Sequence, residues 1–121
     1  MLSTINFTST SAYKDLLSDK SRLGSSTIAQ LFKNDSARQT TYSETFNGIF
    51  FDYSKNLIDE RSFQNLLKLA QECGLKNAIK AQFAGDKINQ TEGRSVLHTA
   101  LRAKPSASVI VDSENIIPKI Q

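Results

Sequence analysis

The sequence has few of the residues that usually build a chemical site. Its 121 residues include one cysteine, Cys73, and one histidine, His98. A single thiol excludes an internal disulfide and a cysteine-based zinc site, and we expect Cys73 to be a buried or half-buried structural side chain. His98 has no partner at the spacing of a metal site or of a nucleophile–base triad. The sequence therefore predicts no metal site and no catalytic triad.

Phosphate-binding loops, basic blocks and long apolar runs are missing as well. The five glycines fit neither the dinucleotide-binding pattern nor the Walker pattern. The 15 basic residues exceed the 12 acidic ones by only three and are spread evenly, so no nucleic-acid-binding face is predicted. No apolar run approaches the roughly 20 residues that span a bilayer, and the amino terminus lacks a secretion signal. We therefore expect a soluble cytoplasmic protein that binds neither nucleic acid nor a membrane.

Local patterns in the first half predict two helices. Residues 11–17 place Tyr13, Leu16 and Leu17 on one helical face, and the helix should end before Arg22-Leu23-Gly24. A second helix should begin at Thr27, because Thr27 and Gln30 stand at the spacing of a capping box. Residues 34–35 should end it.

A β-hairpin should follow the second helix. Residues 40–46 and 49–53 are rich in β-prone side chains and flank Asn47-Gly48, a pair that tolerates the positive φ angles of a tight turn. An isolated hairpin is only marginally stable in water, so its aromatic side chains need a partner surface.

The second half predicts further helices and one short strand. Asp59 should cap a helix that ends at Gly74, and apolar residues repeat every four positions from there to Gly85. Another helix should run from near Thr91 to Lys104-Pro105. Residues 108–112 predict a strand, and a last helix should begin near residue 115, with its three isoleucines lacking a surface to cover them.

These patterns together predict an α+β fold that is mainly helical, with several short helices, one β-hairpin and a short extra strand. Residues 1–10 are polar, and we expect them to be frayed. No series of alternating strands and helices is present, so a complete parallel sheet does not fit in the chain.

Three ordered motifs carry a family resemblance. Residues 85–102 read Gly-Asp-Lys-Ile-Asn-Gln-Thr-Glu-Gly-Arg-Ser-Val-Leu-His-Thr-Ala-Leu-Arg, and residues 52–56 read Asp-Tyr-Ser-Lys-Asn. Leu31-Phe32, Asp35 and Arg38 precede both. The arrangement resembles the amino-terminal part of the glucose-6-phosphate isomerases, and the likeness extends from about residue 27 to the end.

The resemblance implies an activity, but its catalytic residues have no counterparts here. Enzymes of this family interconvert glucose 6-phosphate and fructose 6-phosphate through a cis-enediolate, in glycolysis and gluconeogenesis, with no metal or organic cofactor. A glutamate moves the proton, an arginine stabilises the enediolate, and a histidine and a lysine assist ring opening. In the family those groups lie in two sugar-isomerase (α/β/α) domains and the carboxy-terminal tail, beyond the position of Gln121. We therefore expect residues 1–121 to be an amino-terminal segment without the catalytic domains.

The polar residues of the motifs are the candidate functional side chains. One interpretation is that they line or brace a sugar-phosphate site, and the other is that they form ion pairs and backbone contacts that fix a loop against helices. Glu92 and Arg94 are two positions apart and cannot pair along one helical face, which favours the structural interpretation. We predict no catalytic and no substrate-binding residue in the chain. The signature residues concerned are Asp52, Lys55, Asn56, Lys87, Asn89, Glu92, Arg94, His98 and Arg102.

Two functional hypotheses follow. In the first, the chain is a scaffold segment whose partners are the remainder of the isomerase chain and, in the intact enzyme, a second subunit and the phosphosugar; alone it should be inactive. In the second, it is a standalone helical protein-interaction module derived from an isomerase amino terminus. Its balanced charge and lack of an aromatic-basic stripe argue against nucleic acid as the partner.

Overall fold

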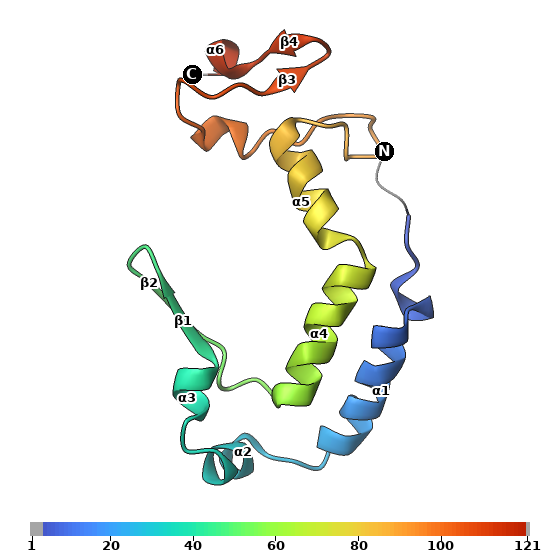
Figure 1. Ribbon diagram of the computed structural model, residues 1–121, viewed down its shortest axis with the longest axis vertical. Coiled ribbons are helices and arrows are strands. Elements are labelled where there is room, and N and C mark those ends of the chain that lie inside the picture. Colours follow the sequence, from blue (N-terminus) through green and yellow to red (C-terminus); the bar gives the residue numbers. More distant parts are fainter. Residues whose placement is uncertain (1–3, 121) are drawn as a thin grey trace. The chain divides into compact units, whose positions relative to one another are not determined.

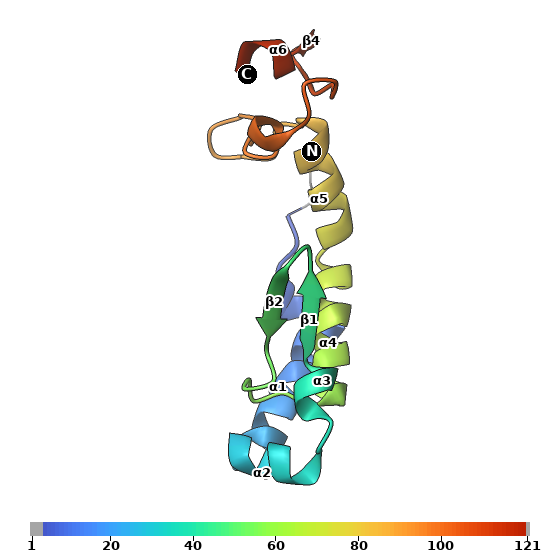
Figure 2. The same ribbon diagram turned by 90° about the vertical axis from the view of Figure 1, so that its left-hand side faces the viewer.

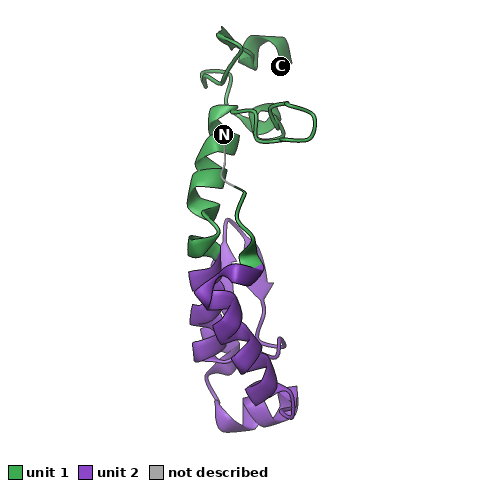
Figure 3. Ribbon diagram, turned by 90° about the vertical axis from the view of Figure 1, so that its right-hand side faces the viewer, with its two compact units in different colours: residues 1–7, 70–121 green, residues 8–69 purple. Residues whose placement is uncertain are grey.

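The computed structural model describes residues 4–120 (Figure 1). These residues divide into two compact units, Thr8–Leu69 and Met1–Phe7 with Ala70–Gln121 (Figure 3). Within the stretch expected to be frayed, a 3₁₀-helix, η1 (Phe7–Ser9), forms, while residues 1–3 lie outside the described part. The predicted class is confirmed, since the described residues form six α-helices and two small antiparallel hairpins.

The Thr8–Leu69 unit begins with two capped helices. Helix α1 (Ser11–Leu23) starts where the Thr10 hydroxyl accepts a hydrogen bond from the Tyr13 amide, and it continues past the predicted end. Helix α2 (Ile28–Asn34) has the predicted capping box, in which the Gln30 amide donates to the Thr27 hydroxyl and the Thr27 amide donates to the Gln30 side chain. A one-turn helix, α3 (Arg38–Thr41), follows.

The predicted hairpin is confirmed. Strands β1 (Ser43–Phe46) and β2 (Ile49–Asp52) pair antiparallel, with Thr45 opposite Phe50. Figure 2 shows the two strands side by side, joined by a tight turn. Asn47 and Gly48 both have positive φ angles, 49° and 79°, as a two-residue hairpin turn requires. The first strand starts later than predicted because Arg38–Thr41 is helical.

Aromatic side chains join the base of the hairpin to helix α4 (Glu60–Glu72). Tyr42 is buried and meets Tyr53 and Phe63 edge-on, with ring centroids 5.9 and 6.2 Å apart. Tyr53 and Phe63 stack at 5.8 Å. Edge-to-face and offset stacked pairs are the favourable aromatic geometries, so this cluster holds the base of the β1–β2 hairpin against α4.

Glycines end the central helices as predicted. Gly74 has φ 71° and separates α4 from α5 (Leu75–Ala84), and Gly85, with φ 84°, ends α5. A side-chain carbon added at Gly85 would lie 2.8 Å from Val109 Cγ1, so this position requires glycine for space as well as for backbone conformation. Among residues 4–120, no helix is both long and apolar enough to cross a membrane.

The helix predicted from Thr91 to Lys104 does not form. Only η2 (Ala100–Arg102), a 3₁₀-helix, is present in that range. Gly93 has a left-handed φ of 65°, and the Ser95 hydroxyl donates to the Gly85 carbonyl at 2.5 Å. These constraints hold residues 85–95 as a loop despite the helical spacing of the apolar residues that follow.

The carboxy-terminal part contains a second hairpin in place of the single predicted strand. Strands β3 (Ile110–Val111) and β4 (Glu114–Asn115) pair antiparallel and lead into α6 (Ile117–Ile120). Ile117 is 1% exposed and packs with Ala100 and Val109. The expectation that this isoleucine lacks a covering surface is therefore wrong, because Ala100 of η2 and Val109, which precedes β3, pack against it.

Candidate functional site

A buried arginine organises the loop after β2. Arg38 is 2% exposed, and its guanidinium donates three hydrogen bonds to backbone carbonyls. Nε reaches the Ser54 oxygen at 2.8 Å, and one terminal nitrogen reaches those of Asn56 at 2.8 Å and Ile58 at 2.9 Å. The guanidinium also lies over the Tyr42 ring, 4.7 Å from its centroid. Its planar fork therefore fixes the path of residues 54–58.

Side chains of the same loop support its turns. The Asp52 carboxylate accepts a hydrogen bond from the Ser54 amide at 2.8 Å. Hydrogen bonding from Ser54 lowers the pKa of the Asp52 carboxyl. Asn56 donates from its side chain to the Tyr53 carbonyl at 3.1 Å, and Lys55 is exposed. Two of the three signature side chains in this loop thus contact the main chain of the loop itself.

The loop forms one wall of an apolar groove in the Thr8–Leu69 unit. The groove has a volume of about 700 Å³. Glu44 is the one charged side chain in its lining. We call this surface the hairpin groove, and its lining residues are Glu44, Phe51, Tyr53, Asn56, Leu57, Ile58, Phe63 and Leu66. Because Arg38 holds the backbone of residues 54–58, it also holds the wall that they supply.

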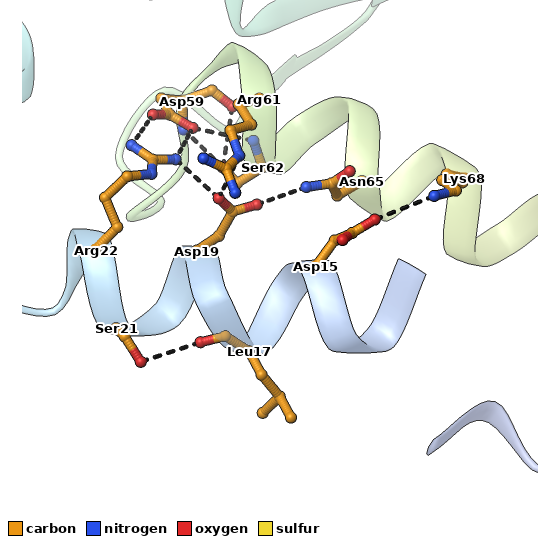
Figure 4. A network of polar contacts seen from close by, with 10 residues as sticks. All are labelled: Asp15, Leu17, Asp19, Ser21, Arg22, Asp59, Arg61, Ser62, Asn65 and Lys68. Atoms are coloured by element: carbon orange, nitrogen blue, oxygen red, sulfur yellow. Dashed lines mark hydrogen bonds and ion pairs between the residues drawn. The ribbon is translucent and has the colours of Figure 1, made fainter. Parts of the chain in front are cut away.

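An ion-pair network joins α1 to the start of α4 (Figure 4). Arg22 donates two hydrogen bonds to the Asp59 carboxylate, at 2.5 and 3.0 Å. Asp59 also accepts from the Ser62 amide at 3.0 Å and so caps α4 as predicted. The Arg22 guanidinium holds the pKa of the Asp59 carboxyl well below its usual range, and Asp59 in turn raises the pKa of Arg22.

Asp19 is the buried member of this network. It is 2% exposed, and one of its oxygens lies 3.0 Å from Arg22 and 3.1 Å from Arg61. The other oxygen accepts a hydrogen bond from Asn65 at 2.7 Å. Burial alone would raise the pKa of Asp19, but the hydrogen bonds from Asn65 and Arg22 outweigh it, so the pKa is lowered. The carboxylate therefore stays charged and structural.

Residues 89–94 of the other unit form a self-contained loop. Asn89 and Arg94 exchange backbone hydrogen bonds in both directions, at 3.1 and 3.2 Å. The Asn89 side-chain oxygen accepts from the Glu92 amide at 3.2 Å, and its nitrogen donates to the Glu92 carboxylate at 3.3 Å. Arg94 is exposed. The polar side chains of Asn89 and Glu92 thus close the loop on itself.

The remaining signature residues also make local contacts. Lys87 pairs with Asp112 at 2.7 Å, and Arg102 donates to the His98 carbonyl at 3.1 Å. The His98 side chain is exposed. In the part of the chain that the structure describes, no group of three or more histidine, cysteine or acidic side chains could hold a metal ion.

Comparison with known proteins identifies the family. The family model described as phosphoglucose isomerase matches residues 52–121. The glucose-6-phosphate isomerase of Christiangramia forsetii is 41% identical over 120 residues. The chain belongs to the phosphoglucose isomerase family. That alignment covers 99% of this chain but 22% of the relative, so the chain spans about a fifth of the relative's length.

The phosphoglucose isomerase signature residues fall into two sets. Asp52, Lys55 and Asn56 belong to the Thr8–Leu69 unit, and the other six belong to the second unit. Inside the second unit, the signature side chains of Asn89 and Glu92 contact each other. Lys87 pairs instead with Asp112, and Arg102 with the His98 carbonyl.

Sequence reasoning missed the two buried charges among the described residues of this phosphoglucose isomerase family member. Arg38 was recognised only as part of a motif, and Asp19 was not singled out. The available signal for Arg38 was its place between the aromatic residues Phe32 and Tyr42, both of which its guanidinium overlies. For Asp19 the signal was the i, i+3 spacing to Arg22.

Proposed function

We propose that this chain is the amino-terminal segment of a glucose-6-phosphate isomerase and acts as its scaffold. The proposed reaction of the intact enzyme is the interconversion of glucose 6-phosphate and fructose 6-phosphate through a cis-enediolate, with no metal or organic cofactor. The support is the relative of that name, which is 41% identical over 99% of this chain.

The scaffold role is supported by the partners of the signature side chains, whose polar atoms bond to groups within this chain. Asp52, Asn56 and Arg102 bond to backbone groups of their own loops. Lys87 pairs with a carboxylate on the β3–β4 turn, and Asn89 bonds to Glu92. Each of these contacts fixes a loop.

Acidity supports the same assignment. Deprotonation of a carbon next to a carbonyl needs a base whose pKa is raised toward neutrality and a fixed cation beside the developing oxyanion. The pKa of Asp19, of Asp52 and of Asp59 is lowered in each case, the opposite of what such a base needs. We assign the proton transfer to residues of the isomerase outside this segment.

The setting of the enzyme is part of the proposal. As an isomerase of glycolysis and gluconeogenesis it would act in the cytoplasm, as a homodimer, with the remainder of its own chain as the first partner of this segment. Neither a membrane nor a nucleic acid is expected as a partner.

The test compares the chain alone with the chain completed by a relative. In a fusion, these 121 residues replace the matching 22% of the Christiangramia forsetii isomerase. A coupled assay then follows conversion of fructose 6-phosphate to glucose 6-phosphate. We expect turnover by the fusion and only background from the chain alone. Turnover by the chain alone, or a folded but inactive fusion, would overturn the proposal.

A second candidate is a standalone protein-interaction module, which is favoured by the exposed phenylalanines of the β1–β2 hairpin. This module should fold and bind a partner without any sugar-isomerase sequence. The same fusion separates the candidates, because a module that evolved away from the enzyme should not restore turnover.

A further inference from the structure

The β1–β2 hairpin leaves large apolar side chains in solvent. Phe46, Ile49, Phe50 and Phe51 are 74%, 70%, 58% and 62% exposed. At roughly 200 Å² for each phenylalanine, the three rings together expose on the order of 400 Å². That is about half of the roughly 800 Å² that one partner buries in a stable interface, before the adjoining hairpin groove is added.

The apolar residues of β2 point to both faces of the hairpin. Side chains alternate along a strand, so Ile49 and Phe51 share one face with Phe46 and lie next to the hairpin groove. Phe50 points to the opposite face. A continuous apolar run of this kind is typical of a strand that is covered on both faces inside a larger sheet.

The two strands differ in a way that distinguishes an interior strand from an edge. Strand β1 reads Ser-Glu-Thr-Phe, so its one apolar residue lies next to the turn and its other positions are polar or charged, as is common in strands that stay at the edge of a sheet. Strand β2 reads Ile-Phe-Phe-Asp, with three consecutive apolar residues. The free edge of β2 is therefore the one suited to pairing.

Hydrogen-bond alternation identifies the backbone groups at that edge. The Tyr53 amide donates to the Tyr42 carbonyl at 2.9 Å, which makes this pair a hydrogen-bonded one. Bonded and non-bonded pairs alternate along an antiparallel ladder, so the opposed residues Thr45 and Phe50 form a non-bonded pair. The amide and carbonyl of Phe50 thus face outward beside β2, and those of Thr45 face outward beside β1.

We propose that β2 is an interior strand of a larger sheet in the intact isomerase, where an apolar strand from the remainder of the isomerase polypeptide pairs with its free edge at Phe50. This inference rests on the proposed function. A two-stranded hairpin alone is marginal, and a third strand with covering side chains supplies what it lacks. The matched region is only 22% of the relative, so the rest of the relative's chain is long enough to provide that strand.

The test uses matched prolines on the two edges in the Christiangramia forsetii fusion. Phe50→Pro removes an amide at the proposed pairing edge, and Thr45→Pro removes the opposed amide at the outer edge of β1. Phe50→Ala removes the ring but keeps the amide. We expect Phe50→Pro to lower the melting temperature and turnover of the fusion well beyond Phe50→Ala, while Thr45→Pro has little effect.

Hydrogen exchange gives a second readout without any substitution. The Phe50 amide should exchange at least about tenfold more slowly in the fusion than in the chain alone, while the Thr45 amide stays fast in both. If the fusion turns over but Phe50 exchanges as fast as Thr45, or the two prolines are equivalent, the inference is wrong and the proposed function stands. An inactive unmodified fusion counts against the proposed function instead. Concentration-dependent protection of Phe50 in the chain alone would identify a second copy as the occupant and overturn the inference.

Discussion

Replacing Arg38 by methionine tests the role of the buried guanidinium most directly. Methionine has a similar length and packs well in an apolar site, but it cannot donate a hydrogen bond. The substitution therefore removes the donors of three backbone carbonyls, those of Ser54, Asn56 and Ile58, at 2.8, 2.8 and 2.9 Å. It also removes the cation above the Tyr42 ring.

The expected loss is large for a unit of this size. A hydrogen bond from a charged donor contributes about 1.5–3 kcal/mol, and a buried carbonyl left without a donor costs about 1–3 kcal/mol. The hydrogen bond from Arg38 to the Ser54 carbonyl is buried. The hydrogen bonds to the Asn56 and Ile58 carbonyls are partly buried, so these two carbonyls can gain water. Allowing for that relaxation, we expect Arg38→Met to lower the free energy of unfolding by about 3–5 kcal/mol. Arg38→Lys keeps the charge but not the planar fork and should cost about 1–3 kcal/mol.

The tyrosines provide a selective assay. Tyr13, Tyr42 and Tyr53 are the three tyrosines of the chain, and all lie in the Thr8–Leu69 unit. Near-ultraviolet circular dichroism during urea unfolding therefore reports this unit. Arg94→Met is the matched control, because Arg94 is exposed and belongs to the other unit. Equal urea midpoints for the Arg38 and Arg94 variants would refute the claim that the guanidinium holds the loop.

Three further predictions concern local structure. Gly85→Ala should cost about 2–4 kcal/mol, from the positive φ and the clash with Val109, and should speed amide exchange in the β3–β4 hairpin; unchanged exchange would contradict this. Arg22 lowers the pKa of Asp59 in the folded state, so this ion pair stabilises the fold at pH values above the unfolded pKa of about 4. The free energy of unfolding should fall by about 1 kcal/mol, after screening, as the pH drops below about 4 toward the folded pKa. Asp59→Asn, which keeps a capping oxygen, should reduce the difference between urea midpoints at pH 6 and pH 3, and an undiminished difference would show that other carboxyl groups cause it. Thr27→Ala should cost about 1 kcal/mol through loss of the α2 cap, measured by tyrosine dichroism against the exposed neighbour variant Ser25→Ala.

Features set by a few neighbouring residues were predictable from the sequence. The capping box at Thr27, the turn at Asn47-Gly48 and the left-handed stop at Gly74 each depend on chemistry within four positions. The hairpin β3–β4 was missed for the opposite reason. Its turn uses Asp112 and Ser113 with φ angles of 49° and 69°, and neither residue type predicts a positive φ as strongly as glycine does.

Contacts distant in sequence account for the other differences. The apolar spacing after Thr91 is helical, but the hydrogen bond from Ser95 to the Gly85 carbonyl spans ten positions and favours a loop. Arg38 meets its carbonyl partners 16 to 20 positions away, and Asp19 meets Asn65 46 positions away. Burial of a charge depends on such partners, so composition and periodicity could not place either residue inside.

Arg38 holds residues 54–58 entirely through their main-chain oxygens. Every amino acid carries that oxygen, so these hydrogen bonds do not depend on which side chains stand at exposed positions such as Lys55 and Leu57. The loop can accordingly present different side chains on an unchanged backbone, which makes it a suitable host for grafting short recognition sequences.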